Sequence, residues 1–155
     1  MKVIIIAAGS STRLAKETSG VPKGLLKING KSIIEIQLEL FQKNQLSDIT
    51  IIIGQDRQKF ELKNLNYIQD HEFQNHDVLG SLMTDKSIIN DDILTSYSDI
   101  IFEEKVFLKY TPFEIKESNN GVCDVLSIPK HWSALNPSTK MNKIFGGILQ
   151  IFSSN

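Results

Sequence analysis

The sequence predicts an α/β domain built on a Rossmann-like, doubly wound and mostly parallel sheet. Residues 3–7 and 49–53 are continuous runs of mainly β-branched side chains, a pattern typical of parallel strands that are covered on both faces. An amphipathic helical pattern lies between them, and strand and helix signals keep alternating as far as residue 97. This alternation indicates βαβ units with right-handed crossovers, which favours a doubly wound sheet.

The first expected strand, residues 3–7, ends near Gly9 and opens into a polar loop. Its apolar run is too short for a signal peptide, so a buried strand is the better interpretation. Residues 25–28 could form a short extended piece, which is closed by the turn signal Asn29-Gly30.

The clearest local signal is a helix start at Ser32. Glu35 follows three residues later and completes a capping box, in which the two residues satisfy each other's backbone amides. Apolar side chains then recur at three- and four-residue spacing and form a wide face: Ile33, Ile34, Ile36, Leu38, Leu40 and Phe41. The helix should end near Asn44-Gln45.

Four further elements are expected after this helix. They are a buried strand at 49–53, a short strand at 66–69, a helix at 78–89 and a strand at 93–97. Each is bounded by glycine, asparagine or aspartate residues that are typical of turns.

Beyond the last of these strands the pattern weakens. Residues 122–128 could form one more strand, and residues 138–155 lack a clear period. We therefore expect a single domain, residues 1–155, with its core at 1–110 and a divergent or truncated tail at 111–155.

The composition excludes several classes of protein. Of 155 residues, 41% are hydrophobic and 23% are charged, and 17 basic against 18 acidic residues leave a net charge of −1. No run of Lys and Arg appears, so a nucleic-acid-binding surface is not expected. A small anionic ligand is still compatible with this balance, because a few cations in one loop can bind phosphate. No stretch approaches the roughly 20 apolar residues that span a bilayer, so no membrane association is expected.

The chain has a single cysteine, Cys123. No internal disulfide can form, and a reducing, cytoplasmic location is therefore expected. Its apolar neighbours Val122 and Val125 favour a packing role over a catalytic thiol.

The residues that can carry chemistry follow two of the expected strands. In an open parallel sheet, ligands bind beyond the carboxyl ends of the strands. After the first strand, small residues from Gly9 to Thr12 would let backbone amides surround a polyphosphate, and Arg13 and Lys23 would add two cations. Neither the P-loop nor the dinucleotide-binding glycine motif is present. Taken alone, the loop fits two interpretations equally well: a phosphate-binding loop, and a simple turn at Gly9 with a solvated Arg13.

One run combines these residues: Ala7-Ala8-Gly9-x-x-x-Arg13-Leu14, followed by Pro22-Lys23. This run resembles the signature of the NTP transferases (nucleotidyltransferases) that make nucleoside-diphosphate sugars and CDP-alcohols. The likeness continues through residues 25–35, 48–54 and 80–82 to Tyr97-Ser98-Asp99, and so covers about residues 1–110.

Within this family, the chain is most similar to the branch related to phosphocholine and aminoethylphosphonate cytidylyltransferases. The resemblance implies a nucleotide-diphospho-sugar transferase-like fold with a truncated C-terminal half. Residues 1–110 would then form the nucleotide-binding core.

The resemblance also implies a role for each matching residue. Arg13 would hold the β- and γ-phosphates, Lys23 would lie near the α-phosphate, and Asp99 would bind Mg²⁺. Gly80 and Ser81 would border the base or the ribose. The backbone of the first loop would line the base and the phosphates through Ala7, Ala8, Gly9, Ser10, Ser11 and Thr12.

The implied reaction transfers a nucleoside monophosphate, with CMP from CTP favoured, to a phosphorylated or phosphonylated small molecule and releases pyrophosphate. An ionised phosphate acceptor needs no general base, so catalysis reduces to positioning and to charge neutralisation by Mg²⁺ and the two cations. CTP is favoured through the resemblance to one branch only, and a sugar 1-phosphate is an alternative acceptor.

The resemblance weakens in the second half of the chain. Family enzymes are substantially longer and normally take a second metal-binding aspartate from a later strand, whereas residues 129–155 contain neither Asp nor Glu. Asp124 is the only acid nearby. Three interpretations therefore stand: an active enzyme of reduced size that a partner subunit completes, as in a homo-oligomer; a truncated nucleotide-binding protein with weak catalysis; and an interaction protein that keeps only the scaffold. Arg13 and Lys23 argue against the last, because a scaffold needs neither cation.

Other polar positions are weaker candidates. Asp91-Asp92 precedes a strand and is expected in a solvated turn. His71 and His76 are five residues apart, which does not place both on one helix face, so a zinc site is not expected. For His131-Trp132, a surface histidine beside a packed aromatic residue is favoured over contact with the acceptor.

Overall fold

A five-stranded sheet forms the centre of the molecule in the computed structural model, which describes residues 1–9, 20–90, 92–105 and 149–152. The strand order is β5-β4-β1-β6-β7. The strands are β1 (Lys2–Ala7), β4 (Ile49–Ile53), β5 (Asn66–Gln69), β6 (Ile93–Tyr97) and β7 (Leu149–Phe152). β1 pairs in parallel with β4 and β6, and β4 with β5, whereas β7 runs antiparallel to β6. The predicted mostly parallel sheet is confirmed.

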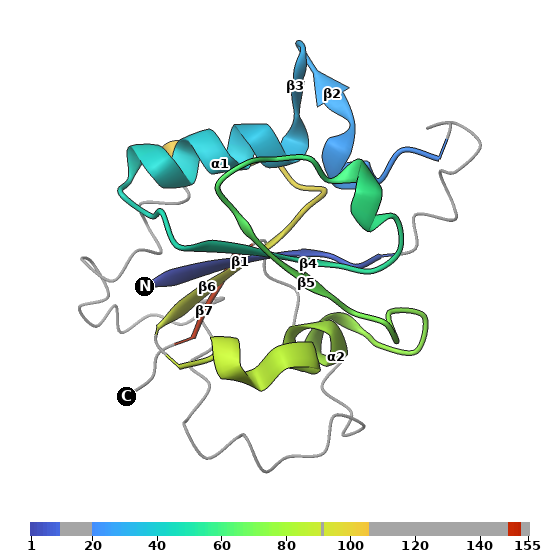
Figure 1. The fold of residues 1–155 in the computed structure, drawn as a ribbon. Coiled ribbons are helices and arrows are strands. Elements are labelled where there is room, and N and C mark those ends of the chain that lie inside the picture. The colour runs from blue at the N-terminus through green and yellow to red at the C-terminus, as the bar shows by residue number, and fades with distance from the viewer. Residues whose placement is uncertain (10–19, 91, 106–148, 153–155) are drawn as a thin grey trace, which may run out of the picture.

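Helices cover both faces of this sheet, as Figure 1 shows. α1 (Ile33–Lys43) lies on one face, and α2 (Val78–Leu82) lies on the other together with the 3-10 helix η4 (Met83–Ile88). Alternate side chains of β1 enter two separate hydrophobic clusters. Val3 belongs to the cluster that contains α1 residues, and Ile4 belongs to the cluster that contains α2 residues. A strand that is buried on both faces is apolar at consecutive positions, which explains the unbroken apolar run. The predicted doubly wound architecture is confirmed.

The start of α1 has the predicted capping box. Ser32 Oγ accepts a hydrogen bond from the Glu35 amide (3.2 Å), and Glu35 Oε2 accepts one from the Ser32 amide (2.7 Å). These hydrogen bonds hold the pKa of Glu35 below its ordinary value. The helix ends at Lys43, with Asn44 as its C-cap, as predicted from the sequence.

A short hairpin precedes α1. Strands β2 (Lys27–Ile28) and β3 (Lys31–Ser32) pair antiparallel. The two residues between them, Asn29 and Gly30, both have positive φ values, 52° and 87°, as a two-residue hairpin turn requires. The extended piece expected at 25–28 is shorter than predicted. Leu25 belongs to a 3-10 helix, η2 (Lys23–Leu25), and the strand begins only at Lys27.

The helix expected at 78–89 is not continuous. Its α-helical part ends at Leu82, and Asp85 has an extended conformation (φ −132°, ψ 96°) within the 3-10 segment that follows. Asp85 Oδ1 accepts hydrogen bonds from the Ser87 amide (3.0 Å) and the Ser87 hydroxyl (2.6 Å). Local side-chain hydrogen bonds of this kind compete with helical ones, and they explain why the periodic pattern overestimates the helix.

Several expectations concern positions outside the described residues: Ser10, Ser11, Thr12, Arg13, Asp91, Cys123, Asp124, His131, Trp132 and the strand at 122–128. In the segment that lacks a clear period, β7 spans only four residues. This strand was not predicted from the sequence.

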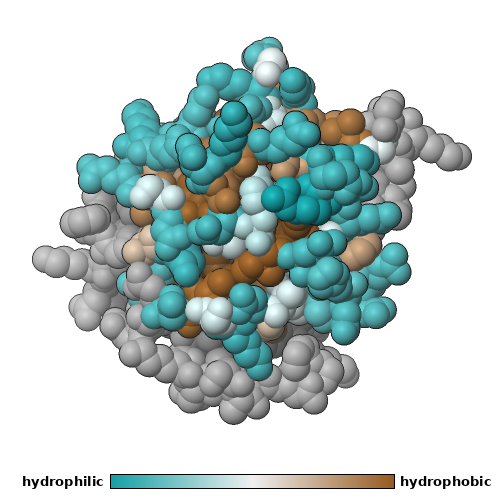
Figure 2. Space-filling view, viewed as in Figure 1, coloured by the Kyte–Doolittle hydropathy of each residue, from teal (hydrophilic) through white to brown (hydrophobic). Residues whose placement is uncertain are grey.

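Hydrophilic residues cover most of the face shown in Figure 2, and hydrophobic residues are seen between them toward the centre of the view. Among the described residues, no helix has both the length and the apolar character needed to cross a membrane.

Candidate functional site

A cleft of about 150 Å³ lies beyond the carboxyl ends of β1 and β6. Most of its lining comes from three chain segments, which are the end of β1, the η2 segment with Pro22 before it, and the end of β6 with the residues that follow it; Phe60 and Val78 complete the lining. The lining residues are Ile6, Ala7, Gly9, Pro22, Lys23, Gly24, Phe60, Val78, Tyr97, Ser98 and Asp99. The position agrees with the general rule that open α/β sheets bind ligands at this edge.

Two opposite charges meet in this cleft. Lys23 Nζ lies 3.3 Å from Asp99 Oδ2, and the two side chains are 38% and 43% exposed. The Ser98 amide donates to the Ile6 carbonyl (3.1 Å), so the pairing of β6 with β1 continues to the residue before Asp99. An exposed ion pair contributes only about 0.2–1 kcal/mol. Either side chain can therefore exchange its partner for a ligand at little cost.

The η2 segment, which carries Lys23, packs closely against the rest of the site through Gly24. A Cβ atom added at Gly24 would lie 2.7 Å from Ile34 Cδ1 and 2.9 Å from Ser98 Cβ. Any larger residue would therefore push η2 away from α1 and from the segment that carries Asp99. The glycine after Lys23 keeps the lysine close to the carboxylate.

The two described ends of the first loop have different contacts. Gly9 is exposed and lines the cleft. Gly20, with a φ of 74°, accepts a hydrogen bond through its carbonyl from Lys59 Nζ (2.7 Å). Lys59 ends the 3-10 helix η3 (Arg57–Lys59), and this contact ties the far end of the loop to the residues after β4.

The cleft offers one carboxylate that could hold a metal ion. Mg²⁺ is usually held by one or two carboxylates together with substrate phosphates and waters, and Asp99 offers one partly exposed carboxylate. Among residues 1–9, 20–90, 92–105 and 149–152, no group of three or more His, Cys, Asp or Glu side chains could hold a metal ion by itself. A metal ion at Asp99 would therefore take its other ligands from outside the described side chains.

Tyr97 is the aromatic polar residue of the cleft. Burial raises the pKa of its phenol, and the negative charges of Asp99 and Asp77 raise it further. Tyr97, which lines the cleft, is thus neutral at neutral pH.

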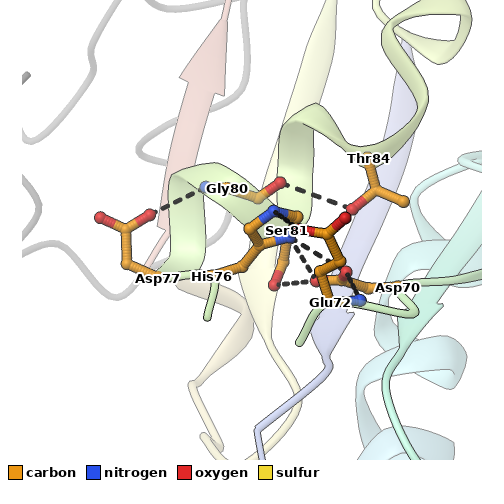
Figure 3. Close-up of polar contacts among 7 residues, drawn as sticks. All are labelled: Asp70, Glu72, His76, Asp77, Gly80, Ser81 and Thr84. Carbon is orange, nitrogen blue, oxygen red and sulfur yellow. Dashed lines mark hydrogen bonds and ion pairs between the residues drawn. The ribbon is translucent and has the colours of Figure 1, made fainter. Parts of the chain in front are cut away.

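Gly80 and Ser81 lie in α2 and do not line this cleft; their neighbour Val78 does. Ser81 is 4% exposed, and its hydroxyl donates to Asp70 Oδ2 (2.8 Å). The Gly80 amide donates to Asp77 Oδ1 (2.8 Å), as Figure 3 shows. The role at the base or ribose that the resemblance implies for these two residues stays a prediction.

Asp70 is the centre of a second polar cluster (Figure 3), which we call the Asp70 network: Asp70, Glu72, His76 and Ser81. Asp70 is 1% exposed. His76 Nδ1 lies 3.0 Å from each of its carboxylate oxygens, and the Glu72 amide donates to Oδ1 (3.0 Å). The carboxylate lies between the hydroxyl and the imidazole, whereas a nucleophilic triad has the imidazole between the other two. The network therefore does not form a hydrolytic site.

Hydrogen bonding keeps Asp70 ionised. Burial raises its pKa, but the hydrogen bonds from Ser81, His76 and the Glu72 amide, together with the charge of His76, lower it more. The net pKa lies below the ordinary value of 3.8. His76, which the sequence discounts as a zinc ligand, thus takes part in a carboxylate network.

Asp70, Gln37 and Phe60 were not predicted from the sequence as site residues, and Pro22 was named only as part of the family signature. Asp70 directly follows β5, so the carboxyl-edge rule that led to Asp99 could also have found it. Gln37 is a polar residue within the apolar face of α1 and is 1% exposed. A polar residue in that position is a signal in its own right, because buried amides need partners.

Comparison with known proteins gives one matching family. The sequence profile of the MobA-like NTP transferase domain matches residues 3–130. The choline-phosphate cytidylyltransferase of Streptococcus pneumoniae is 40% identical over 67 residues, which are 43% of this chain and 29% of that protein. A bifunctional sugar-1-phosphate nucleotidylyltransferase/acetyltransferase of Sulfurisphaera tokodaii is 33% identical over 108 residues, which are 68% of this chain and 26% of that protein.

Comparison with solved structures also gives nucleotidyltransferases. The CTP:phosphocholine cytidylyltransferase of Streptococcus pneumoniae superposes with a TM-score of 0.60 at 29% identity, over 66% of this chain and 47% of that one. The inositol-1-phosphate CTP transferase of T. maritima has a TM-score of 0.60 at 14% identity, over 70% of this chain and 47% of that one, and shows likeness of fold alone. The chain thus spans less than half the length of each of these relatives.

Proposed function

The chain belongs to the MobA-like NTP transferase family, whose profile matches residues 3–130, and from this premise we propose that it transfers a nucleoside monophosphate from a nucleoside triphosphate to a small phosphorylated or phosphonylated acceptor. The favoured donor is CTP. The observation that carries the proposal is the convergence of Gly9, Lys23 and Asp99 on one cleft at the carboxyl edge of a parallel sheet.

The proposed reaction needs charge neutralisation more than proton transfer. An oxygen of the acceptor phosphate attacks the α-phosphorus, a new P–O bond forms, and the bond between the α-phosphorus and the β-phosphate oxygen breaks to release pyrophosphate. The attacking oxygen is already ionised, so no general base is required. Lys23 would neutralise negative charge at the α-phosphate, and Arg13 would hold the leaving pyrophosphate.

Asp99 is the proposed metal ligand, and Mg²⁺ bound there would supply further charge neutralisation on the phosphate oxygens. The exposure of the Asp99 carboxylate supports this role, since it leaves an oxygen accessible from the cleft. The exposed Lys23–Asp99 pair is weak enough to separate when phosphates enter.

CTP and a choline-phosphate-like acceptor are supported by the relative that is 40% identical. A sugar 1-phosphate is the second candidate acceptor, and it is supported by the longer alignment with a sugar-1-phosphate nucleotidylyltransferase. A third candidate function is nucleotide binding with weak catalysis, because Asp99 is the single carboxylate that lines the cleft among the described residues.

Calorimetry with CTP, UTP, dTTP, ATP and GTP, each with and without Mg²⁺, tests the proposal. We expect Mg²⁺-dependent binding of CTP in preference to the other four. A pyrophosphate-release assay with phosphocholine, aminoethylphosphonate and sugar 1-phosphates then separates the candidates: release with one acceptor identifies the enzyme, and binding without release identifies a nucleotide-binding protein. No binding of any nucleotide would refute both.

A further inference from the structure

The amide side chain of Gln37 lies under the segment that carries Asp99. Gln37 is in α1, on the face that packs against the sheet, and it is 1% exposed. Burial of an amide is unfavourable unless its polar atoms are hydrogen-bonded. The partners of this side chain therefore indicate what it does.

Both hydrogens of the amide go to one short segment. Gln37 Nε2 donates to the Tyr97 carbonyl (2.8 Å) and to the Ile100 carbonyl (2.7 Å). On the other side, Gln37 Oε1 accepts a hydrogen bond from Ser96 Oγ (3.0 Å). The two carbonyls fix which way the amide faces, because a carbonyl can only accept and therefore requires the nitrogen; the Ser96 hydroxyl can donate, and it completes the set by donating to the oxygen.

The two carbonyls lie on either side of Ser98-Asp99. Tyr97 is the last residue of β6, and beyond it the chain turns away from the sheet. The amide of Gln37 joins the start of this turn to its end. With both ends held, and with the Ser98 amide bound to the Ile6 carbonyl (3.1 Å), the backbone that carries Asp99 has little freedom to rotate.

We propose that Gln37 is a positioning residue, which holds the turn after β6 so that Asp99 presents its carboxylate to the cleft. This inference rests on the proposed function, in which Asp99 binds Mg²⁺ together with the nucleotide. It adds a residue outside the cleft on which the metal site depends. Gln37 makes no contact with substrate; it acts through the backbone of residues 97–100.

The role is specific to a glutamine amide. A methionine keeps the length and the apolar stem but donates no hydrogen bond to the two carbonyls. A glutamate turns an acceptor toward them, and its charge would be buried. An asparagine is one methylene shorter, so it cannot reach both carbonyls from the same backbone position. Each of these substitutions releases the turn to a different degree.

Gln37→Met is the principal test, and Gln42→Met, at an exposed position of the same helix, is its matched control. The measurements are the dissociation constant of Mg²⁺ with CTP by calorimetry and the hydrogen-exchange rates of the amides of residues 98–101. Residues that orient a metal ligand typically change metal affinity by about 10–100-fold. We expect Gln37→Met to weaken Mg²⁺ binding by about that factor and to speed exchange in the turn, and Gln42→Met to do neither.

A purely structural role gives a different result. In that case Gln37→Met lowers the melting temperature, but the folded protein binds Mg²⁺ with CTP as the wild type does, and this outcome overturns the proposal. If Gln37→Met does not fold, Gln37→Asn takes its place: weaker Mg²⁺ affinity in the folded variant supports the proposal, and unchanged affinity overturns it. A wild-type protein that binds no Mg²⁺ with any nucleotide refutes the proposed function itself, and the role of Gln37 with it.

Discussion

Two aspartates follow strands of the same sheet, and their surroundings are opposite. Asp70 comes directly after β5, is 1% exposed, and accepts hydrogen bonds from three donors. Asp99 lies two residues after β6, is 43% exposed, and has Lys23 at 3.3 Å as its ion-pair partner. The comparison shows how one sheet edge can carry a carboxylate that stabilises the fold and another that is available to a ligand.

The difference comes from how many partners each carboxylate has and how firmly they are held. The donors to Asp70 come from α2 and from the turn that precedes it, so the Asp70 network joins β5 to the helix on one face of the sheet. Lys23 is on a short 3-10 segment and is exposed. Substitutions at Asp70 should therefore change stability first, and substitutions at Lys23 or Asp99 should change binding and turnover first.

Asp70→Ala should have the largest effect on stability. The substitution removes the acceptor of three hydrogen bonds, and a hydrogen bond to a charged group typically contributes about 1.5–3 kcal/mol. It leaves the Ser81 hydroxyl and the His76 imidazole without their acceptor. Urea unfolding measures the change. A loss below about 1 kcal/mol, the range of an exposed pair, would mean that the two aspartates do not differ as described.

Lys23→Ala should lower turnover strongly and change stability little, the reverse of what is expected for Asp70→Ala. Removal of one well-aimed donor to a transition-state oxyanion typically costs about 2.7–4 kcal/mol, or two to three orders of magnitude in turnover. The free energy of unfolding should change by no more than about 1 kcal/mol, because the ion pair is exposed. Steady-state turnover and urea unfolding of the same preparation check both parts. Near-normal turnover would remove Lys23 from the proposed reaction.

Ser81→Ala should give an intermediate loss of stability. A hydrogen bond to a charged group contributes about 1.5–3 kcal/mol, and Ser81 donates to a buried carboxylate. Ser87→Ala is the matched control, because the hydroxyl of the exposed Ser87 also donates to a carboxylate, that of the half-buried Asp85; surface substitutions usually stay within about 0.5 kcal/mol. Equal losses in the two variants, measured by urea unfolding, would contradict a special role for the buried network.

The pH dependence of stability, compared between wild type and Asp70→Asn, should show the smallest of these effects. The pKa of Asp70 in the folded protein lies below its ordinary value of 3.8, so its contribution is fully present above that value and is lost as the pH falls through the folded pKa. Asp70→Asn cannot titrate at this position. The free-energy gap between wild type and Asp70→Asn should therefore narrow as the pH falls below about pH 4. A gap that stays constant down to pH 3 would place the stabilisation elsewhere.

Sequence alone predicted the features that local chemistry determines. The capping box of Ser32 and Glu35 depends on residues three positions apart, and the apolar run of residues 49–53 depends on burial of both faces of a strand. The carboxyl-edge rule and the family signature led to Lys23 and Asp99, and the structure brings both into one cleft. Their roles in catalysis and metal binding stay predictions.

The features that the sequence did not predict depend on contacts between distant segments. Gln37 and Tyr97 are 60 positions apart, and no local pattern links a helix glutamine to a turn after another strand. The helix expected at 78–89 was wrong in its second half because the competing hydrogen bonds of Asp85 are invisible to hydrophobic periodicity. The partners of Asp70 depend on where α2 packs, which only the folded structure specifies.

The central claim is that the backbone at Gly9, the Lys23 ammonium and the Asp99 carboxylate surround one metal-bound triphosphate. Nuclear magnetic resonance of the protein with CTP and Mn²⁺, in place of Mg²⁺, tests this most directly, because a paramagnetic ion broadens the signals of nearby amides. We predict the strongest broadening at Gly9 and at residues 98–100, and its loss in Asp99→Asn. Strongest broadening around Asp70, or broadening that is unchanged in Asp99→Asn, would contradict the account.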